Sequence, residues 1–196
     1  MTCSNASILS KSVLFALFAI ASMRFAEASP TVRDTKGEKR DPLGDRGQKA
    51  TVLFFVMHDC PIANSYAPEL ARIAAEYTPR GIEFFAVYCA ETPQEANAHL
   101  AEYRIPFTGL CDPKLQLARR AGATVVPEAA VFSRTGELLY RGRIDDRAVR
   151  FGAVRPEPRR RDLRLALDAV LAGRKVAPRF TTAVGCYLPA DEPSNK

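Results

Sequence analysis

The sequence predicts an α/β fold: a central mixed sheet with flanking helices, then a C-terminal β-hairpin and one further helix. Three observations lead to this prediction. Apolar runs and amphipathic stretches alternate along the first half of the chain, which is typical of parallel strands joined by crossover helices. Two short apolar segments around a turn then indicate an antiparallel hairpin. The 196 residues are 47% hydrophobic and 26% charged, the balance of a single globular domain.

The same composition excludes several classes of protein. A wholly disordered chain, a collagen, a coiled coil and a multi-span membrane protein all need a different balance of residues. Five cysteines fall short of a disulfide-stapled miniprotein, and two histidines argue against a histidine-rich metal site. We therefore expect neither a metal nor an organic cofactor.

The first half of the chain contains two apolar runs, residues 50–57 (ATVLFFVM) and 82–89 (IEFFAVYC). Runs rich in β-branched and aromatic residues are typical of strands buried on both faces of a sheet. The stretch between them predicts a helix, because its apolar residues recur every three or four positions: Ile62, Tyr66, Leu70, Ile73 and Tyr77. Pro68 lies inside this helix and should kink it.

The second half predicts the remaining elements from turn residues and periodicity. Thr92-Pro93 opens a helix, and Gly122 ends the next helix, which runs through Leu115 and Ala121. Arg134-Thr135-Gly136-Glu137 has the composition of a hairpin turn. The expected strands and last helix are residues 107–111, 128–133, 138–144 and 162–171. Together they give one domain over residues 49–173.

The two ends of the chain have their own patterns. Residues 1–28 resemble a secretory signal: Lys11 precedes nine apolar residues, too few to span a bilayer, and Ala26-Glu27-Ala28 has the small-x-small pattern of a cleavage site. We expect an exported, periplasmic or extracellular protein without a stable membrane span after cleavage; an uncleaved N-terminal anchor is the alternative. Polar residues 29–48 predict a flexible lead-in, and residues 174–196 a polar tail.

The net charge is +6, and basic residues gather near the last helix at Arg155, Arg159, Arg160, Arg161 and Arg164. The cluster has no interleaved aromatic residues and matches no nucleic-acid motif. It is interpreted as a solvated face or as a docking patch for an acidic partner, with no nucleic acid as partner.

Cys60 is the strongest candidate for chemistry. It follows a predicted buried strand and precedes Pro61, which prefers the first helical position and so makes Cys60 the N-cap. The sulfur would then face the unpaired amides and the positive dipole end of the helix, which favour the thiolate. His58, two residues earlier, would add positive charge or shuttle a proton. The alternative is an inert buried cysteine at a strand end.

The stretches HDCPIANSYAPEL, GATVVPEAAVF and LLYRGRIDD resemble the thioredoxin fold between about Ala50 and Leu171. Within that fold the chain is similar to the secreted redoxin group, with thioredoxin-like and AhpC/TSA-type members. Some similar bacterial proteins carry a cytochrome c module, but no CxxCH haem motif occurs here.

The resemblance implies roles for particular residues. Counting back from Pro68, Cys60 matches the attacking cysteine of thioredoxins, while Ala63 occupies the position of their resolving cysteine. Pro127 matches the family's cis-proline, which faces the active cysteine and helps to present backbone to a substrate. The peroxiredoxin pattern fits less well, because Met57 and Leu53 stand where that family has a threonine and a proline. Arg143, on the returning strand, is interpreted as a solvated residue or as a neighbour of the site.

Three cysteines remain as partners for Cys60 or for one another. Cys89 and Cys111 end neighbouring strands at the carboxyl edge of the predicted sheet, where a disulfide between them is geometrically plausible. Two separate small hydrophobic residues are the alternative. Cys186 lies in the tail, where it would resolve Cys60 by analogy with some peroxiredoxins or stay a free thiol. Its neighbours Tyr187 and Leu188 indicate that the tail docks.

Two further features are interpreted as structural. His99 is expected at the surface or half-buried, and Asp145-Asp146 in a turn or a salt bridge rather than a metal site.

Three functions stay open at this point. The first is an exported thiol–disulfide oxidoreductase that uses Cys60 as nucleophile and acts on protein or small-molecule thiols and disulfides. The second is a thiol peroxidase with peroxide as substrate. The third is a non-catalytic thioredoxin-like module that binds partners or transfers electrons to a secreted partner.

Overall fold

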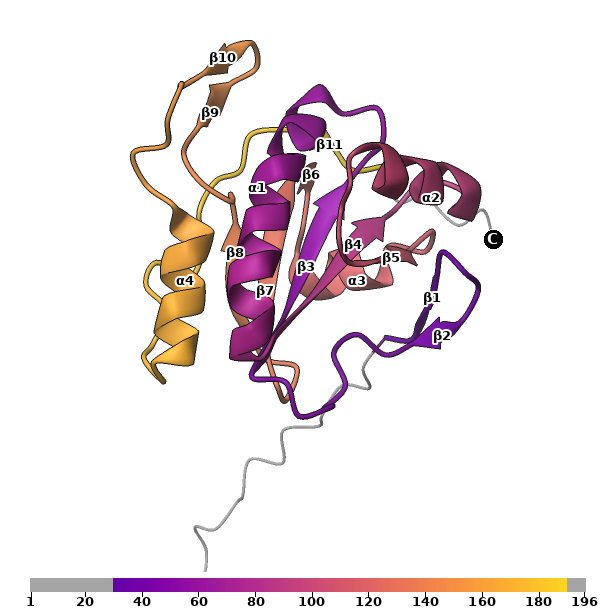
Figure 1. Cartoon of the computed structure of the whole chain (residues 1–196), viewed down its shortest axis with the longest axis horizontal. Helices are drawn as coiled ribbons and strands as arrows, with labels where there is room; N and C mark the ends of the chain where they lie inside the picture. The colour runs from indigo at the N-terminus through magenta and orange to yellow at the C-terminus, as the bar shows by residue number, and fades with distance from the viewer. Residues whose placement is uncertain (1–29, 190–196) are drawn as a thin grey trace, which may run out of the picture.

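A computed structural model describes residues 30–189 of the chain (Figure 1). A seven-stranded mixed sheet forms its centre, with the strand order β2-β1-β5-β4-β3-β7-β8. The parallel part consists of β3 (Ala50–Val56), β4 (Ile82–Tyr88) and β5 (Thr108–Cys111). The predicted hairpin, β7 (Glu128–Ser133) and β8 (Leu138–Gly142), adds antiparallel strands beside β3. The predicted mixed sheet is confirmed.

Helices cover both faces of this sheet (Figure 1). The larger core packs the sheet against α1 (Pro61–Tyr77), α2 (Pro93–Glu102) and α4 (Asp162–Leu171). The second core packs the other face against α3 (Gln116–Ala121). A short 3-10 helix, η1 (Thr78–Arg80), ends α1, and Gly81 adopts a left-handed φ of 93° there. The long helix α1 runs without interruption through Pro68.

The flexible lead-in expected over residues 29–48 is wrong in its described part. Here β1 (Val32–Asp34) pairs with β2 (Lys39–Arg40) and with β5, so this segment extends the sheet. The buried Asp34 carboxylate holds the hairpin: it accepts hydrogen bonds from the amides of Lys36 and Glu38 and from Arg40 Nε. A strand this short, closed by side-chain bonds, leaves little hydrophobic periodicity to detect. The predicted signal over residues 1–28 lies outside the described residues.

Two small strand pairs were not predicted. β9 (Ala148–Arg150) and β10 (Ala153–Val154) form a hairpin that stands out from the body between β8 and α4 (Figure 1). β6 (Val125–Val126) pairs with β11 (Cys186–Tyr187), which belongs to the predicted tail. The tail therefore folds back onto the domain over its described length.

The strand predicted over residues 138–144 ends early, at Gly142, because the tail crosses it there. Gly142 has a φ of 149°, and a Cβ on it would lie 2.2 Å from Thr181 Oγ1. Thr181 in turn shares a hydrogen bond of 2.6 Å with the Tyr140 hydroxyl and accepts one from the amide of Arg143. The crossing is thus a specific contact between tail and sheet edge.

Candidate active site

Cys60 lies at the N-terminus of α1, as the sequence predicts. The Cys60 backbone is extended (φ −87°, ψ 107°), and Pro61 is the first residue of the helix. The Cys60 carbonyl accepts a hydrogen bond from the amide of Asn64. The sulfur is fully buried, and its thiol donates to the carbonyl of Val126 at 3.4 Å. It accepts no capping hydrogen bond from the helix amides, in part because Pro61 has no N–H. The expected amide cradle is thus replaced by a contact with β6.

The partner strand β6 reaches Cys60 from a turn that contains a cis peptide bond between Val126 and Pro127. The cis-proline implied by the family resemblance is therefore confirmed. The buried Glu128 carboxylate accepts the amide of Thr124 at 3.0 Å and lies 3.8 Å from Arg141, so it fixes the segment that carries β6. Burial, which outweighs these contacts, raises the pKa of Glu128.

The tail brings Cys186 to the same place. β11 runs antiparallel to β6 with Cys186 opposite Val126, and the amide of Leu188 donates to the Thr124 carbonyl at 3.0 Å. This approach requires a glycine before the cysteine: a Cβ on Gly185 would lie 1.8 Å from the Val126 carbonyl oxygen. The structure thus brings together Cys60, Cys186 and the Val126-Pro127 turn.

The two thiols interact directly. Burial, a hydrogen bond with Cys60 and the nearby Asp59 carboxylate together raise the pKa of Cys186 to about 11. Cys186 therefore keeps its proton at neutral pH. Both cysteines carry free thiols in this structure, as do Cys89 and Cys111.

His58 lies apart from this pair. Its backbone amide donates to the buried Glu91 carboxylate at 3.0 Å, and its Nδ1 lies 3.4 Å from the same oxygen. Within residues 30–189, no hydrogen bond joins His58 to the Cys60 sulfur. Its geometry assigns the ring to Glu91, at the end of β4, rather than to the thiols.

His99 belongs to a buried network behind the same loop. The Asn64 amide group donates to the His58 carbonyl at 2.8 Å, so its oxygen faces His99 Nε2 at 2.9 Å. The other ring nitrogen meets the Tyr88 hydroxyl at 2.7 Å. Burial lowers the pKa of His99, which favours the neutral ring with Nε2 protonated. The expectation of a surface or half-buried residue is wrong, since His99 is only 3% exposed.

The structure does not bring Cys89 and Cys111 together. Their strands are parallel neighbours, but Cys89 packs in the core on the α3 side. Cys111 is two residues beyond Gly109, whose Cβ position faces Leu100 and Tyr88 on the opposite side of the sheet. Burial raises the pKa of both thiols. The two cysteines thus behave as separate side chains.

Arg143 and the Asp145-Asp146 pair are structural in this geometry. Arg143 Nε bonds Asp162 at 2.6 Å, away from the thiols. Asp145 accepts the Tyr66 hydroxyl at 2.6 Å, and Asp146 accepts backbone amides in the following loop. Asp145 also accepts the amide of Arg147, and Asp146 lies 3.5 Å from Arg155, so the expected place of the pair in a turn or a salt bridge is confirmed.

Sequence reasoning missed Glu91, Asn64, Gly185 and Asp59. The first two act only through contacts between distant segments, for which a single sequence gives no signal. Gly185 was detectable in principle, since a glycine beside a cysteine in a polar tail can mark a close backbone approach.

Across residues 30–189 there is no group of three His, Cys, Asp or Glu side chains suited to a metal ion. In the same part of the chain, no helix has both the length and the apolar character needed to cross a membrane.

Comparisons with known proteins agree with this architecture. The AhpC/TSA family model matches residues 28–141. An uncharacterized conserved protein from Geobacillus kaustophilus is similar in structure, with a TM-score of 0.69 and 27% identity over 86% of this chain and 92% of its own. A hypothetical protein from Sinorhizobium meliloti 1021 has a TM-score of 0.68 and 26% identity, over 82% and 90% of the two chains.

A third similar structure has a name that states an activity. It is a putative thiol:disulfide interchange protein DsbE from Chlorobium tepidum, with a TM-score of 0.56 and 22% identity over 73% of this chain and 94% of its own. At that identity the likeness shows the thioredoxin-like fold. The comparison with curated proteins gives no match.

Proposed function

Because the chain belongs to the AhpC/TSA family, we propose that it is a thiol–disulfide oxidoreductase in which Cys60 is the nucleophile and Cys186 resolves. One observation carries the proposal: the tail is built to hold Cys186 in contact with Cys60 beside the cis-proline turn. The similarity to the putative thiol:disulfide interchange protein DsbE supports the same class of reaction. Cys186 takes the role that Ala63 cannot fill.

The reaction follows ordinary thiol–disulfide exchange. The Cys60 thiolate attacks one sulfur of a substrate disulfide and releases the other as a thiolate, which takes up a proton. Cys186 then loses its proton, and its sulfur attacks Cys60 and displaces the second substrate thiolate. The substrate gains two electrons and becomes two thiols, while the protein becomes a Cys60–Cys186 disulfide. An external dithiol reverses this oxidation, and the relative potentials set the net direction.

The assignment of nucleophile and resolver rests on two asymmetries. Cys60 lies at the N-cap of α1 beside the cis-proline turn, which is the place of the attacking cysteine that the family resemblance implies. Cys186 has a pKa raised to about 11, so it stays a thiol until Cys60 has reacted. Burial is the largest cause of this raised pKa, and the contact with Cys60 adds to it. Opening of the tail for the substrate reduces the burial, and a mixed disulfide on Cys60 removes the contact, so attack by Cys186 becomes easier.

Substrate access requires the tail to move, since the Cys60 sulfur is fully buried. The tail is well suited to this, because β11 has only two residues and pairs with only two. Short, peripheral pairings open at a small fraction of the global unfolding free energy. Opening exposes Cys60 and the β6 edge together.

A trapping experiment tests the proposal. The reduced protein is mixed with a disulfide-containing peptide, and products are followed by mass spectrometry. We expect wild type to release both peptide thiols without a lasting adduct, Cys186→Ser to accumulate a mixed disulfide on Cys60, and Cys60→Ser to do neither. Cys111→Ser replaces a thiol on β5 outside the Cys60–Cys186 contact, serves as the matched control and should behave as wild type.

Three outcomes would overturn the proposal. Full turnover by Cys186→Ser would remove its role as resolver. Faster oxidation of Cys60 by hydrogen peroxide than by the peptide would favour a thiol peroxidase. An inert Cys60 in wild type would favour a non-catalytic binding module.

The location follows from the N-terminal sequence. We propose that the protein is exported, with residues 1–28 removed as a signal. N-terminal sequencing of protein recovered from the periplasm or medium should begin at Ser29. Recovery of an intact N-terminus in the membrane fraction would instead indicate a retained anchor.

A further inference from the structure

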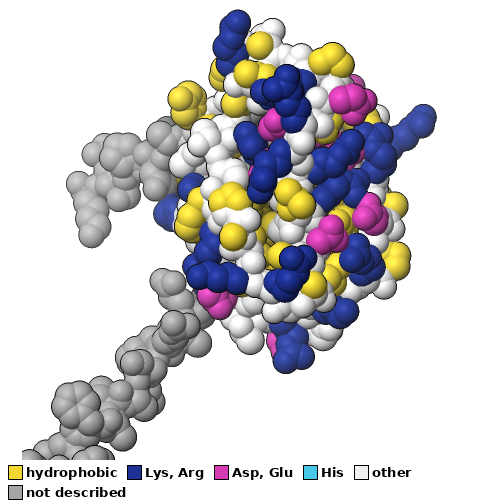
Figure 2. Space-filling model, turned by 90° about the vertical axis from the view of Figure 1, so that its left-hand side faces the viewer, with side chains coloured by type: hydrophobic (Ala, Val, Ile, Leu, Met, Phe, Trp, Pro, Cys, Tyr) yellow, Lys and Arg dark blue, Asp and Glu magenta, His cyan; other side chains and the backbone are white. Residues whose placement is uncertain are grey.

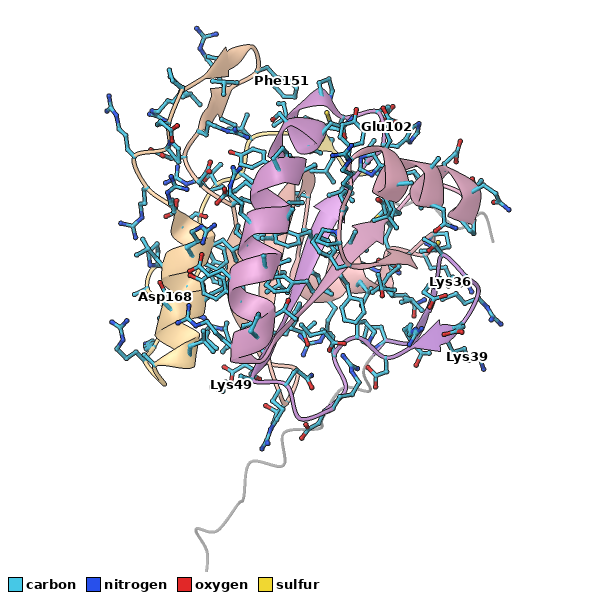
Figure 3. The ribbon with its side chains drawn as sticks, in the orientation of Figure 1. Lys36, Lys39, Lys49, Glu102, Phe151 and Asp168 are labelled. Carbon is cyan, nitrogen blue, oxygen red and sulfur yellow. The ribbon has the colours of Figure 1, made fainter. Side chains whose placement is uncertain are left out.

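The β9–β10 hairpin exposes large apolar side chains that no other part of the described chain covers. Val149, Phe151 and Val154 are 45%, 60% and 60% exposed, and they account for half of the exposed large hydrophobic residues in the described chain. Phe151 lies at the tip, which projects beyond the body of the protein (Figure 3). Exposed apolar residues clustered on a protrusion are typical of an interaction site.

Hydrogen bonds fix the base of the hairpin to the body of the protein, so the tip has a defined position. The Asp146 amide donates to the Arg160 carbonyl, and the Asp146 carboxylate accepts the amides of Arg159 and Arg160 at 2.7 and 2.9 Å. Arg147 bonds the Ser65 carbonyl at 2.9 Å and stacks on Tyr66, which ties the hairpin to α1. These contacts indicate that the hairpin is an ordered surface element and not a mobile loop.

The hairpin and the strand-free segment after it, residues 147–161, are strongly basic. They contain six arginines, one glutamate and no lysine. Figure 2 shows basic side chains spread over the face of the molecule that carries α4 and the hairpin, with apolar groups between them. Arg150 and Arg159 are exposed and form no ion pair with any described residue. Their guanidinium groups remain available to a ligand.

We propose that this hairpin binds an anionic phospholipid membrane, with Phe151 inserted at the interface and the arginines on lipid phosphates. Guanidinium groups bind phosphate through paired hydrogen bonds, which accounts for the exclusive use of arginine. A convex tip with three apolar side chains offers too little area for a stable protein interface, which buries about 800 Å² per partner. A fluid interface needs no complementary pocket. Self-association through this hairpin is opposed by its charge.

This inference does not depend on the redox chemistry. If both hold, membrane binding brings the thiol site near the lipid surface, because the hairpin and the N-terminus of α1 lie at the same end of the molecule (Figure 1).

The absence of tryptophan from the chain makes a local test possible. In the full-length Phe151→Trp protein, the single indole reports on the hairpin tip alone. Vesicles of phosphatidylcholine with phosphatidylglycerol should shift its emission to the blue, and high salt should reverse the shift. Pure phosphatidylcholine vesicles should leave it unchanged. Phe180→Trp, at a similarly exposed aromatic residue on the tail (54% against 60%), is the matched control and should not respond.

Charge variants complete the test. Arg150→Glu and Arg159→Glu, each in the Phe151→Trp background, should weaken binding to the anionic vesicles by about fivefold or more, from the usual contribution of one basic residue near such a surface. An unchanged indole spectrum of the Phe151→Trp protein with anionic vesicles overturns the proposal. This holds even if the protein co-sediments with the vesicles, because binding would then occur through another segment. An equal response to neutral vesicles overturns the role of lipid charge. A response to an added acidic protein alone would indicate protein docking instead.

Discussion

Gly185 is the residue on which the contact between the two cysteines most directly depends. Any larger side chain there meets the Val126 carbonyl, which is part of the backbone and cannot rotate away. The same carbonyl accepts the Cys60 thiol, so one peptide group contacts both Cys60 and the strand that carries Cys186.

Replacement of this glycine should open the site. In Gly185→Val, we expect β11 to leave β6 and the alkylation of Cys60 by a maleimide to become about tenfold faster or more, since burial no longer limits access. Mass spectrometry of the alkylated peptides identifies the residue modified. Thr182→Val, an exposed tail position, is the matched control and should react like wild type. An unchanged rate in Gly185→Val would mean that the tail does not protect Cys60.

His99 gives a residue-scale prediction for pH. Its pKa is lowered in the folded protein by burial, from a value of 6.5 in the free side chain. Below about pH 6.5 the unfolded chain binds a proton that the folded protein does not, so the free energy of unfolding falls as the pH decreases through this range. Above that range the ring is neutral in both states and adds no pH dependence.

The variant His99→Gln should lose this contribution. Urea denaturation of both proteins between pH 5 and about 8 measures it, because the difference between them cancels most carboxylate titrations. We expect the two stabilities to converge toward acid pH, with the variant less stable by about 1–3 kcal/mol near neutrality from lost buried hydrogen bonds. A constant difference across the range would contradict a buried neutral ring.

At the scale of elements, α4 contributes to the stability of the fold through the packing of its buried face. Leu167 is fully buried against the sheet, while Leu165 on the same helix is half exposed. We expect Leu167→Ala to reduce the free energy of unfolding by about 2–5 kcal/mol and Leu165→Ala by less than about 0.5 kcal/mol. Chemical denaturation tests the pair. Equal losses would show that α4 does not pack as described.

The elements that the sequence predicted are those whose own residues carry a pattern. The runs at residues 50–57 and 82–89 became β3 and β4, and the last helix has the predicted bounds, Asp162–Leu171. In contrast, β1, β6 and β11 are two or three residues long. Each forms because of a contact with a distant segment: a pairing strand, a buried carboxylate or a glycine that allows close approach. A short stretch of sequence gives no signal of such contacts.

The residues of the candidate site also fall into two groups: those that a local motif predicts and those that depend on distant contacts. Cys60 and Pro61 form one short motif, and Pro127 belongs to a second one. All three could therefore be predicted from the sequence and its resemblance to the thioredoxin fold. The orientation of His58 toward Glu91 depends on a carboxylate in a different loop, so the expected help to Cys60 is not seen in the contacts. The approach of Cys186 required the whole path of the tail.

At the scale of the whole molecule, the chain ends close the sheet on both sides. The β1–β2 hairpin extends the sheet beyond β5, and the tail crosses the other edge at β8 before it reaches β6. The proposed pairing of Cys60 with Cys186 therefore depends on the complete path of the tail, because Cys186 comes from beyond the last helix. We expect loss of the tail to expose Cys60 and to remove the resolving partner proposed for it.

The most direct test of this account is a disulfide map of the full chain after equilibration in an oxidising glutathione buffer. Free thiols are blocked in denaturant, and the linked peptides are identified by mass spectrometry. We expect an intramolecular disulfide between Cys60 and Cys186, with Cys89 and Cys111 still reduced. A Cys60 that stays free, or that pairs with Cys89 or Cys111 while Cys186 remains a thiol, would contradict it.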